Sequence, residues 1–146
     1  MKELTLPAAR ESVPEMIAFV NGLLAEMRCP ARLSRRIGIV IDEVLANIAG
    51  YAYGEGRGTM TVRFQLEEHP LTAVITFVDR GQPFNPLQAP PPDLTPSAEK
   101  RPVGGLGVFL VKKTMDDVTY LRLDGQNILT IRKQIRAEYG DRIKID

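Results

Sequence analysis

Two pairs of short strands, each pair joined by a tight turn, constrain the fold of this chain more than any other feature. Alternating apolar residues at 59–66 and 71–78 flank the polar sequence EEHP, and those at 118–123 and 128–135 flank DGQN. Turns of this length join antiparallel strands, because parallel strands need a crossover of about a dozen residues or more. The pattern therefore excludes a doubly wound parallel sheet and predicts an α+β fold.

Apolar residues at helical spacing predict three helices. The first covers residues 14–28, the second and longest covers residues 31–51, and the third runs from Val108 to about Met115. With a short strand at residues 3–6, the elements occur in the order strand, helix, helix, hairpin, connection, helix, hairpin. This order predicts a two-layer sandwich, in which a mostly antiparallel sheet is covered on one face by the three helices.

The connection between residues 82 and 102 is unusual in composition. It holds seven of the eleven prolines of the chain, and neither a helix nor a central strand accommodates that density. A connection of about twenty residues inside one domain is commonly a functional lid or a disordered linker. We expect a single domain over residues 1–136, with a lid at about 82–103, followed by a charged tail at 137–146.

The overall composition narrows the classes of function. The 146 residues carry a formal charge of +1, one cysteine (Cys29) and one histidine (His69). The near-neutral charge gives no electrostatic argument for direct binding to nucleic acid or to a membrane surface. One cysteine and one histidine argue against an internal disulfide, a zinc site and a Ser-His-Asp triad. With no run of about 18 apolar residues and no secretory signal at its start, the chain is expected to be cytoplasmic.

The second helix carries a candidate pair for phosphate chemistry. Glu43 and Asn47 are four residues apart and therefore share one helical face, at the flank of the apolar stripe. The amide oxygen of Asn47 could ligate Mg2+, and the carboxylate of Glu43 could take a proton from a hydroxyl group or from water. Taken alone, the pair is more typical of a solvated helix surface, because such pairs are common on helices.

Two further motifs come from other parts of the chain. Asp79 ends an apolar strand and is followed by Gly81, so its carboxylate could accept a hydrogen bond from an exocyclic amine such as that of adenine, although a β-turn explains the same residues. The sequence Gly104-Gly105-Leu106-Gly107 precedes the third helix, where free backbone N–H groups and the helix dipole favour an anion. A flexible hinge is the alternative, because the sequence matches neither the P-loop nor the dinucleotide-binding pattern.

Together the three motifs are far more specific. Glu-x-x-x-Asn on a helix, Asp-x-Gly at a strand end and Gly-x-Gly at the start of a helix, in this order, resemble the N, G1 and G2 boxes of the GHKL (histidine kinase-like) ATPase superfamily, which has the Bergerat-type ATP-binding fold. The short form of the chain looks like the anti-sigma-factor serine/threonine kinases of the RsbW and SpoIIAB type. The resemblance covers residues 4–133, and residues 79–84 and 104–118 are its most specific stretches.

The resemblance implies roles for individual residues. Glu43 would be the general base, Asn47 would hold Mg2+ on the ATP phosphates, and Asp79 would bind the adenine amine with Gly81 beside the ring. Backbone N–H groups of Gly104, Gly105, Leu106 and Gly107 would contact the phosphates, with Lys100 and Arg101 as candidate cations for the γ-phosphate. Phosphoryl transfer of this kind depends on positioning and charge neutralisation.

The implied activity is an ATP- and Mg2+-dependent serine/threonine protein kinase. By resemblance its substrate is a STAS-domain anti-anti-sigma protein, its second partner is a sigma factor, and it can form a homodimer. Tyr51 stands where family members often have histidine, and no role is assigned to it. Two alternatives stay open: an ATP-gated regulator that binds a partner without kinase activity, and a detached histidine-kinase-like ATPase domain.

Overall fold

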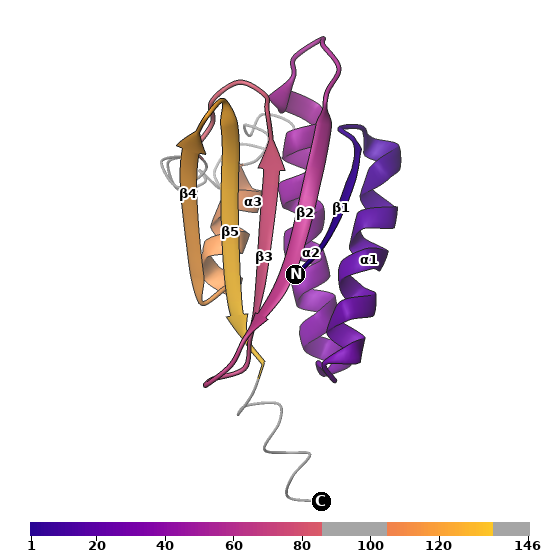
Figure 1. Ribbon diagram of the computed structural model, residues 1–146, viewed down its shortest axis with the longest axis vertical. Coiled ribbons are helices and arrows are strands. Elements are labelled where there is room, and N and C mark those ends of the chain that lie inside the picture. Colours follow the sequence, from indigo (N-terminus) through magenta and orange to yellow (C-terminus); the bar gives the residue numbers. More distant parts are fainter. Residues whose placement is uncertain (86–104, 136–146) are drawn as a thin grey trace, which may run out of the picture.

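The sheet has five strands and every neighbouring pair is antiparallel. The computed structural model describes residues 1–85 and 105–135, with only the backbone described for 105–109. The strands are β1 (Lys2–Pro7), β2 (Thr59–Glu67), β3 (Thr72–Asp79), β4 (Asp117–Leu123) and β5 (Gln126–Gln134). Their order is β1-β2-β3-β5-β4, with the two predicted hairpins side by side (Figure 1). The predicted antiparallel sheet is confirmed.

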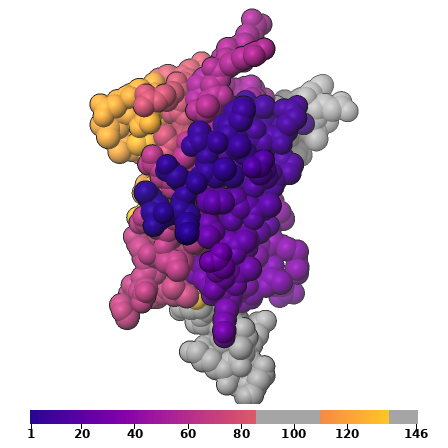
Figure 2. All heavy atoms as spheres, turned by 45° about the vertical axis from the view of Figure 1, so that its right-hand side comes forward, coloured from indigo at the N-terminus to yellow at the C-terminus, as the bar shows by residue number. Residues whose placement is uncertain are grey.

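Helices in the described part of the chain cover one face of the sheet. They are α1 (Val13–Glu26), α2 (Ala31–Asn47) and α3 (Gly105–Thr114), with a short 3-10 turn, η1 (Arg10–Ser12), before α1. Figure 1 shows all three α-helices on the same side, with α2 between α1 and α3. The view in Figure 2 brings the α1 side forward, where the indigo N-terminal residues form one continuous surface. The predicted two-layer arrangement is therefore confirmed.

The core lies between α2 and the sheet. The apolar stripe of α2 is buried, with Ile37, Ile41 and Leu45 each 0% exposed. Strand β2 alternates buried and more exposed residues, as expected for a strand with one covered face, whereas nearly all residues of the central strand β3 are buried. This packing fixes the C-terminal end of α2 beside the C-terminal end of β3.

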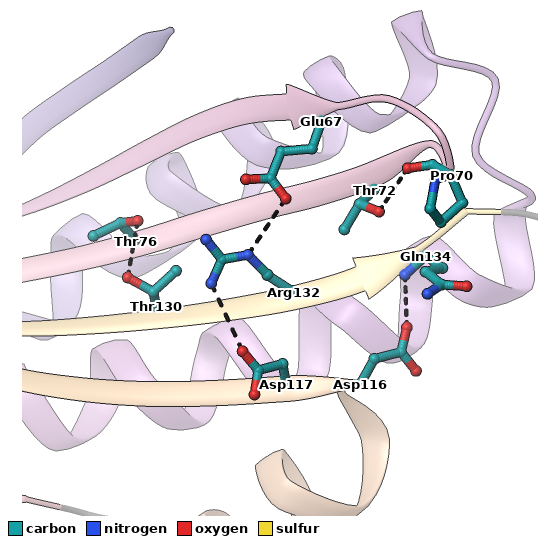
Figure 3. A network of polar contacts seen from close by, with 9 residues as sticks. All are labelled: Glu67, Pro70, Thr72, Thr76, Asp116, Asp117, Thr130, Arg132 and Gln134. Atoms are coloured by element: carbon teal, nitrogen blue, oxygen red, sulfur yellow. Dashed lines mark hydrogen bonds and ion pairs between the residues drawn. The ribbon is translucent and has the colours of Figure 1, made fainter.

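Polar side chains occupy the sheet face that the helices leave open (Figure 3). On β5, Arg132 lies 3.5 Å from Glu67 of β2 and 3.7 Å from Asp117 of β4. The hydroxyl groups of Thr76 and Thr130 are 3.3 Å apart on neighbouring strands. Cross-strand pairs of this kind stabilise a sheet modestly, and they let this face meet solvent.

Several element boundaries differ from the sequence-based expectations. Helix α2 ends at Asn47 and continues as a π-helical segment, η2 (Ile48–Ala52), instead of as an α-helix to residue 51. Helix α3 begins at Gly105, three residues before the predicted start at Val108. Residues 86–103 of the predicted lid and the tail at 137–146 lie outside the described residues. No helix in the described ranges has the length and apolarity that crossing a bilayer requires.

Candidate functional site

A cavity of about 490 Å³ opens where the end of α2, the segment η2, the ends of β3 and β5, and helix α3 meet. Its size lies within the roughly 300–1,000 Å³ typical of small-molecule pockets. Its walls are mainly apolar, with Phe77 and Leu129 on the sheet side and Val111 on α3. The polar side chains that line it are Asn47, Tyr51, Asp79, Gln82, Lys112, Tyr120 and Asn127.

The long helix brings one of its two predicted residues into this wall. Asn47, the last residue of α2, is half-buried and lines the cavity. Glu43 lies one helical turn earlier and is also half-buried. It is not among the described residues that line the cavity. The Asn47 amide is thus at the cavity, and Glu43 precedes it by one turn on the same face of the helix.

Asp79 closes β3 and is the one buried carboxylate among the residues that the structure describes. Its side chain is 6% exposed. Its Oδ1 accepts a hydrogen bond of 2.8 Å from the backbone N–H of Gly81 and one of 2.9 Å from Nδ2 of Asn127. A buried carboxylate needs such partners, because an unpaired buried charge is costly. These two bonds fix the orientation of the carboxylate in the cavity wall.

Gly81 has a packing reason to be glycine. A Cβ atom at this position would lie 2.1 Å from the backbone oxygen of Ala52, which is the last residue of η2. Next to it, the N–H of Gln82 donates to that same oxygen at 2.7 Å, and Nε2 of Gln82 donates to the backbone oxygen of Tyr51 at 2.8 Å. The crowding accounts for glycine here without any ligand, which sequence reasoning did not anticipate.

Two neighbouring residues complete the anchoring of this loop. The hydroxyl of Tyr53 accepts a hydrogen bond from the backbone N–H of Arg80 at 2.8 Å and donates to the backbone oxygen of Thr59 at 2.6 Å. On β4, Arg122 donates from its guanidinium to the backbone oxygen of Gly81 at 2.8 Å. The segment that follows Asp79 is therefore held from η2 and from β4.

Sequence reasoning missed Asn127 and Tyr120. Asn127 was predicted in the turn before the last strand, but it lies in β5, opposite Asp79 in the ladder, and is 7% exposed. Tyr120 of β4 donates its hydroxyl hydrogen to Oδ1 of Asn127. Asn127 could have been predicted beside Asp79 only from the pairing of β3 with β5 in the correct register. Local sequence does not contain that information.

Helix α3 contributes a cation and a helix terminus. Lys112 lines the cavity, a position that was not predicted for it from sequence. Gly105, Leu106 and Gly107 lie in the first turn of α3, where backbone N–H groups have no partner within the helix. Gly104, Lys100 and Arg101 lie outside the described residues.

The donor set at the cavity bears on which metal it could hold. Among the described residues, no group of three or more His, Cys, Asp or Glu side chains is arranged to hold a metal ion. A zinc-type centre is therefore not formed by these residues. Mg2+ differs, since it commonly uses one or two protein oxygens together with substrate phosphates and water, and the Asn47 amide oxygen is an oxygen ligand of that type.

The chain also resembles known proteins in sequence. The family model described as a histidine kinase-like ATPase domain matches residues 6–133. The serine-protein kinase RsbW of Halalkalibacterium halodurans is 31% identical over 95% of this chain and 86% of its own length. The protein of the same name from Bacillus mycoides is 29% identical over 93% of this chain and 86% of its own length.

Solved structures share the fold at lower identity. The RsbU and RsbW domains of a Mycobacterium tuberculosis protein match 94% of this chain with a TM-score of 0.62 at 14% identity, and the chain spans 34% of that longer one. A histidine kinase domain from Erythrobacter litoralis matches 73% of this chain and 46% of its own, with a TM-score of 0.54 at 18% identity. By the extent of the family match and the similarity to these relatives, the chain belongs to the histidine kinase-like ATPase domain family.

Proposed function

We propose that this protein is an ATP- and Mg2+-dependent serine/threonine protein kinase that acts as an anti-sigma factor. It phosphorylates a STAS-domain anti-anti-sigma protein and sequesters a sigma factor. The observation that carries the proposal is that one cavity of nucleotide size has both Asn47 of α2 and Asp79 of β3 in its wall. Relatives named serine-protein kinase RsbW, which this chain covers to 86% of their length, support the choice of reaction.

The adenine ring binds at the Asp79 end of the cavity. Because Oδ1 of Asp79 accepts the hydrogen bonds from Gly81 and Asn127, Oδ2 is the oxygen that accepts one from the exocyclic amine of the base. The aromatic and aliphatic side chains of Phe77 and Leu129 supply the apolar surface that a planar ring requires. Gly81 supports this position by letting the loop pack tightly on Ala52.

The phosphates extend from there toward α2 and α3. Asn47 offers its amide oxygen to Mg2+ that is shared with the phosphates. First-turn N–H groups of α3, at Gly105, Leu106 and Gly107, bind phosphate oxygens with help from the helix dipole. Gly104, Lys100 and Arg101 complete this group in the proposal, with the two cations directed at the γ-phosphate.

Glu43 is the general base of the proposed transfer. It takes the proton of a seryl or threonyl hydroxyl group as the oxygen attacks the γ-phosphorus of ATP, and ADP leaves. The protein therefore contributes mainly position and charge neutralisation. A phosphoryl group adds about −1.5 to −2 charges to the substrate at neutral pH, which would disrupt an apolar or acidic contact and release it.

The direct test combines the purified chain with candidate STAS-domain proteins, Mg2+ and γ-labelled ATP. The proposal predicts acid-stable label on one STAS protein, and a loss of that label with the Glu43→Gln variant. A matched Glu15→Gln variant, at an exposed position on α1, should keep full transfer. Label that is acid-labile would indicate a histidine acceptor, and no label on any candidate would overturn the kinase proposal.

A second function is favoured by one observation. Glu43 lies outside the cavity wall formed by the described residues, as it would in an ATP-gated regulator that binds its partner without chemistry. That alternative predicts nucleotide binding without turnover and normal regulation by the Glu43→Gln variant. Loss of regulation in that variant would favour the kinase.

A further inference from the structure

The side chain of Asn127 makes a complete set of hydrogen bonds. Its Nδ2 donates to Oδ1 of Asp79 and to the backbone oxygen of Gln82, both at 2.9 Å. Its Oδ1 accepts from the hydroxyl of Tyr120 and, at 3.4 Å, from the backbone N–H of Phe84. A primary amide has two N–H donors and two acceptor sites. Asn127 therefore has no hydrogen-bonding capacity left for a ligand.

The chemistry of the four partners fixes the orientation of this amide. Nδ2 faces two acceptors, the Asp79 carboxylate and the Gln82 carbonyl oxygen, and Oδ1 faces two donors. Turning the amide over would place like groups against each other at three of the four contacts, those with Asp79, Gln82 and Phe84, because the Tyr120 hydroxyl can also accept a hydrogen bond. The side chain is 7% exposed, so water cannot readily replace a lost partner.

From this geometry we infer that Asn127 is a positioning residue. It orients the Asp79 carboxylate for the nucleobase and joins it to the backbone at residues 82–84. The inference rests on the proposed nucleotide site and deepens it, because it gives a function to a residue that does not touch the nucleotide. Asp79 Oδ1 is held by Asn127, so Oδ2 keeps a fixed direction. The same Asn127 amide also forms hydrogen bonds with the backbone of Gln82 and Phe84, in the segment after β3. A base bound to Asp79 is therefore coupled to that segment.

The Asn127→Asp variant tests the inference because it replaces a donor by a second carboxyl group. Two carboxyl groups at hydrogen-bond distance cannot both ionise easily, so the pKa of one is raised well above its usual range. When that proton is present, the introduced carboxyl donates to Asp79 as the amide does. When it is lost, two negative charges face each other and Asp79 is displaced.

Other charged and titratable side chains of the described residues also contact this loop or line the cavity. Tyr120 and Arg122 approach from β4, with Arg122 bound to the Gly81 backbone oxygen, and Lys112 of α3 and Tyr51 of η2 line the cavity. All four are present in the wild type as well. The ratio of the ADP dissociation constants of variant and wild type therefore isolates the new carboxyl group from these side chains and from the titration of ADP itself.

The experiment measures ADP binding with Mg2+ by calorimetry from about pH 5 to about pH 9. Affinity of the Asn127→Asp variant should approach that of the wild type at the acidic end and become roughly tenfold weaker or more at the alkaline end. The Asn21→Asp variant, at an exposed position on α1, should follow the wild type throughout. A ratio that does not change with pH would overturn the inference.

A second variant keeps the test decisive if Asn127→Asp does not fold. Tyr120→Phe removes only the hydroxyl that binds Oδ1 of Asn127, and ADP affinity should fall by roughly two- to tenfold. Unchanged affinity would contradict the positioning role. The outcomes also separate the two proposals: wild-type protein that binds no ADP refutes the nucleotide site, whereas binding that needs Asp79 but is insensitive to both variants refutes only the role of Asn127.

Discussion

Gly81 packs directly against the backbone of Ala52, so closely that a Cβ atom would lie 2.1 Å from the Ala52 oxygen and 2.4 Å from its carbonyl carbon. The contact joins the loop after β3 to the end of η2, and the hydrogen bond from the N–H of Gln82 to the Ala52 oxygen reinforces it. Asp79, two residues before Gly81, and Asn47, five residues before Ala52, line the same cavity. The distance between the two parts of the proposed nucleotide site thus depends on a glycine.

The Gly81→Ala variant should be destabilised and should bind nucleotide weakly. The new methyl group meets backbone atoms, which cannot rotate away, and overpacking of this kind costs about 1–3 kcal/mol. Gly22→Ala is the matched control, because nothing lies within 4 Å of its Cβ position on α1. That control should gain about 0.5–1 kcal/mol from helix propensity. Urea unfolding gives the free energy of unfolding of both variants. A Gly81→Ala variant as stable as the wild type would show that the loop adjusts freely.

Glu43→Gln separates catalysis from binding. The substitution keeps the size of the side chain and removes the base, so phosphoryl transfer should fall by roughly 10²–10⁴-fold. The affinity for Mg2+-ATP should change little, because Glu43 lies outside the cavity wall formed by the described residues. Single-turnover kinetics give the rate of phosphoryl transfer, and calorimetry on the same preparation gives the dissociation constant for Mg2+-ATP. A variant that transfers phosphate at the wild-type rate would exclude Glu43 as the base.

Cys29 should make stability fall at alkaline pH. Burial raises the pKa of its thiol, and a hydrogen bond with Ser34 lowers it by less. A group with a raised folded pKa contributes fully below its unfolded pKa of about 8.5, and this contribution is lost as the pH rises through the folded value. The free energy of unfolding of the wild type should therefore decrease more than that of Cys29→Ala between about pH 8 and pH 10. If the free energies of unfolding of the two proteins changed equally with pH over this range, the prediction would be contradicted.

The elements could be predicted from sequence because their causes are local. The stripe on α2 and the alternation in β2 record which side of each element is covered, and the short turns fix antiparallel pairing. The boundaries around glycines were less accurate. Gly105 was placed before the third helix, but it lies inside α3 at the first turn, where the usual helical hydrogen bond is absent in any case.

The cavity could be predicted only in part. Asn47 and Asp79 carry recognisable motifs, and both line it. Asn127 carries none, since its role depends on a partner 48 residues earlier in the chain and on the pairing of β3 with β5. Gly81 was recognised as important but for a different reason, because the proximity of Ala52 arises from tertiary packing that local sequence does not record.

The most direct measurement is the affinity for Mg2+-ATP of the wild type and of Asp79→Asn. The variant keeps an oxygen for Gly81 and Asn127 but turns the other oxygen into an amide donor, which faces the donor amine of adenine. Calorimetry should show binding by the wild type and a loss of about 1.5–3 kcal/mol in the variant, with Asp42→Asn, exposed on α2, as the unaffected control. Equal binding by wild type and Asp79→Asn, or no binding by the wild type, would contradict the assignment of this cavity to a purine nucleotide.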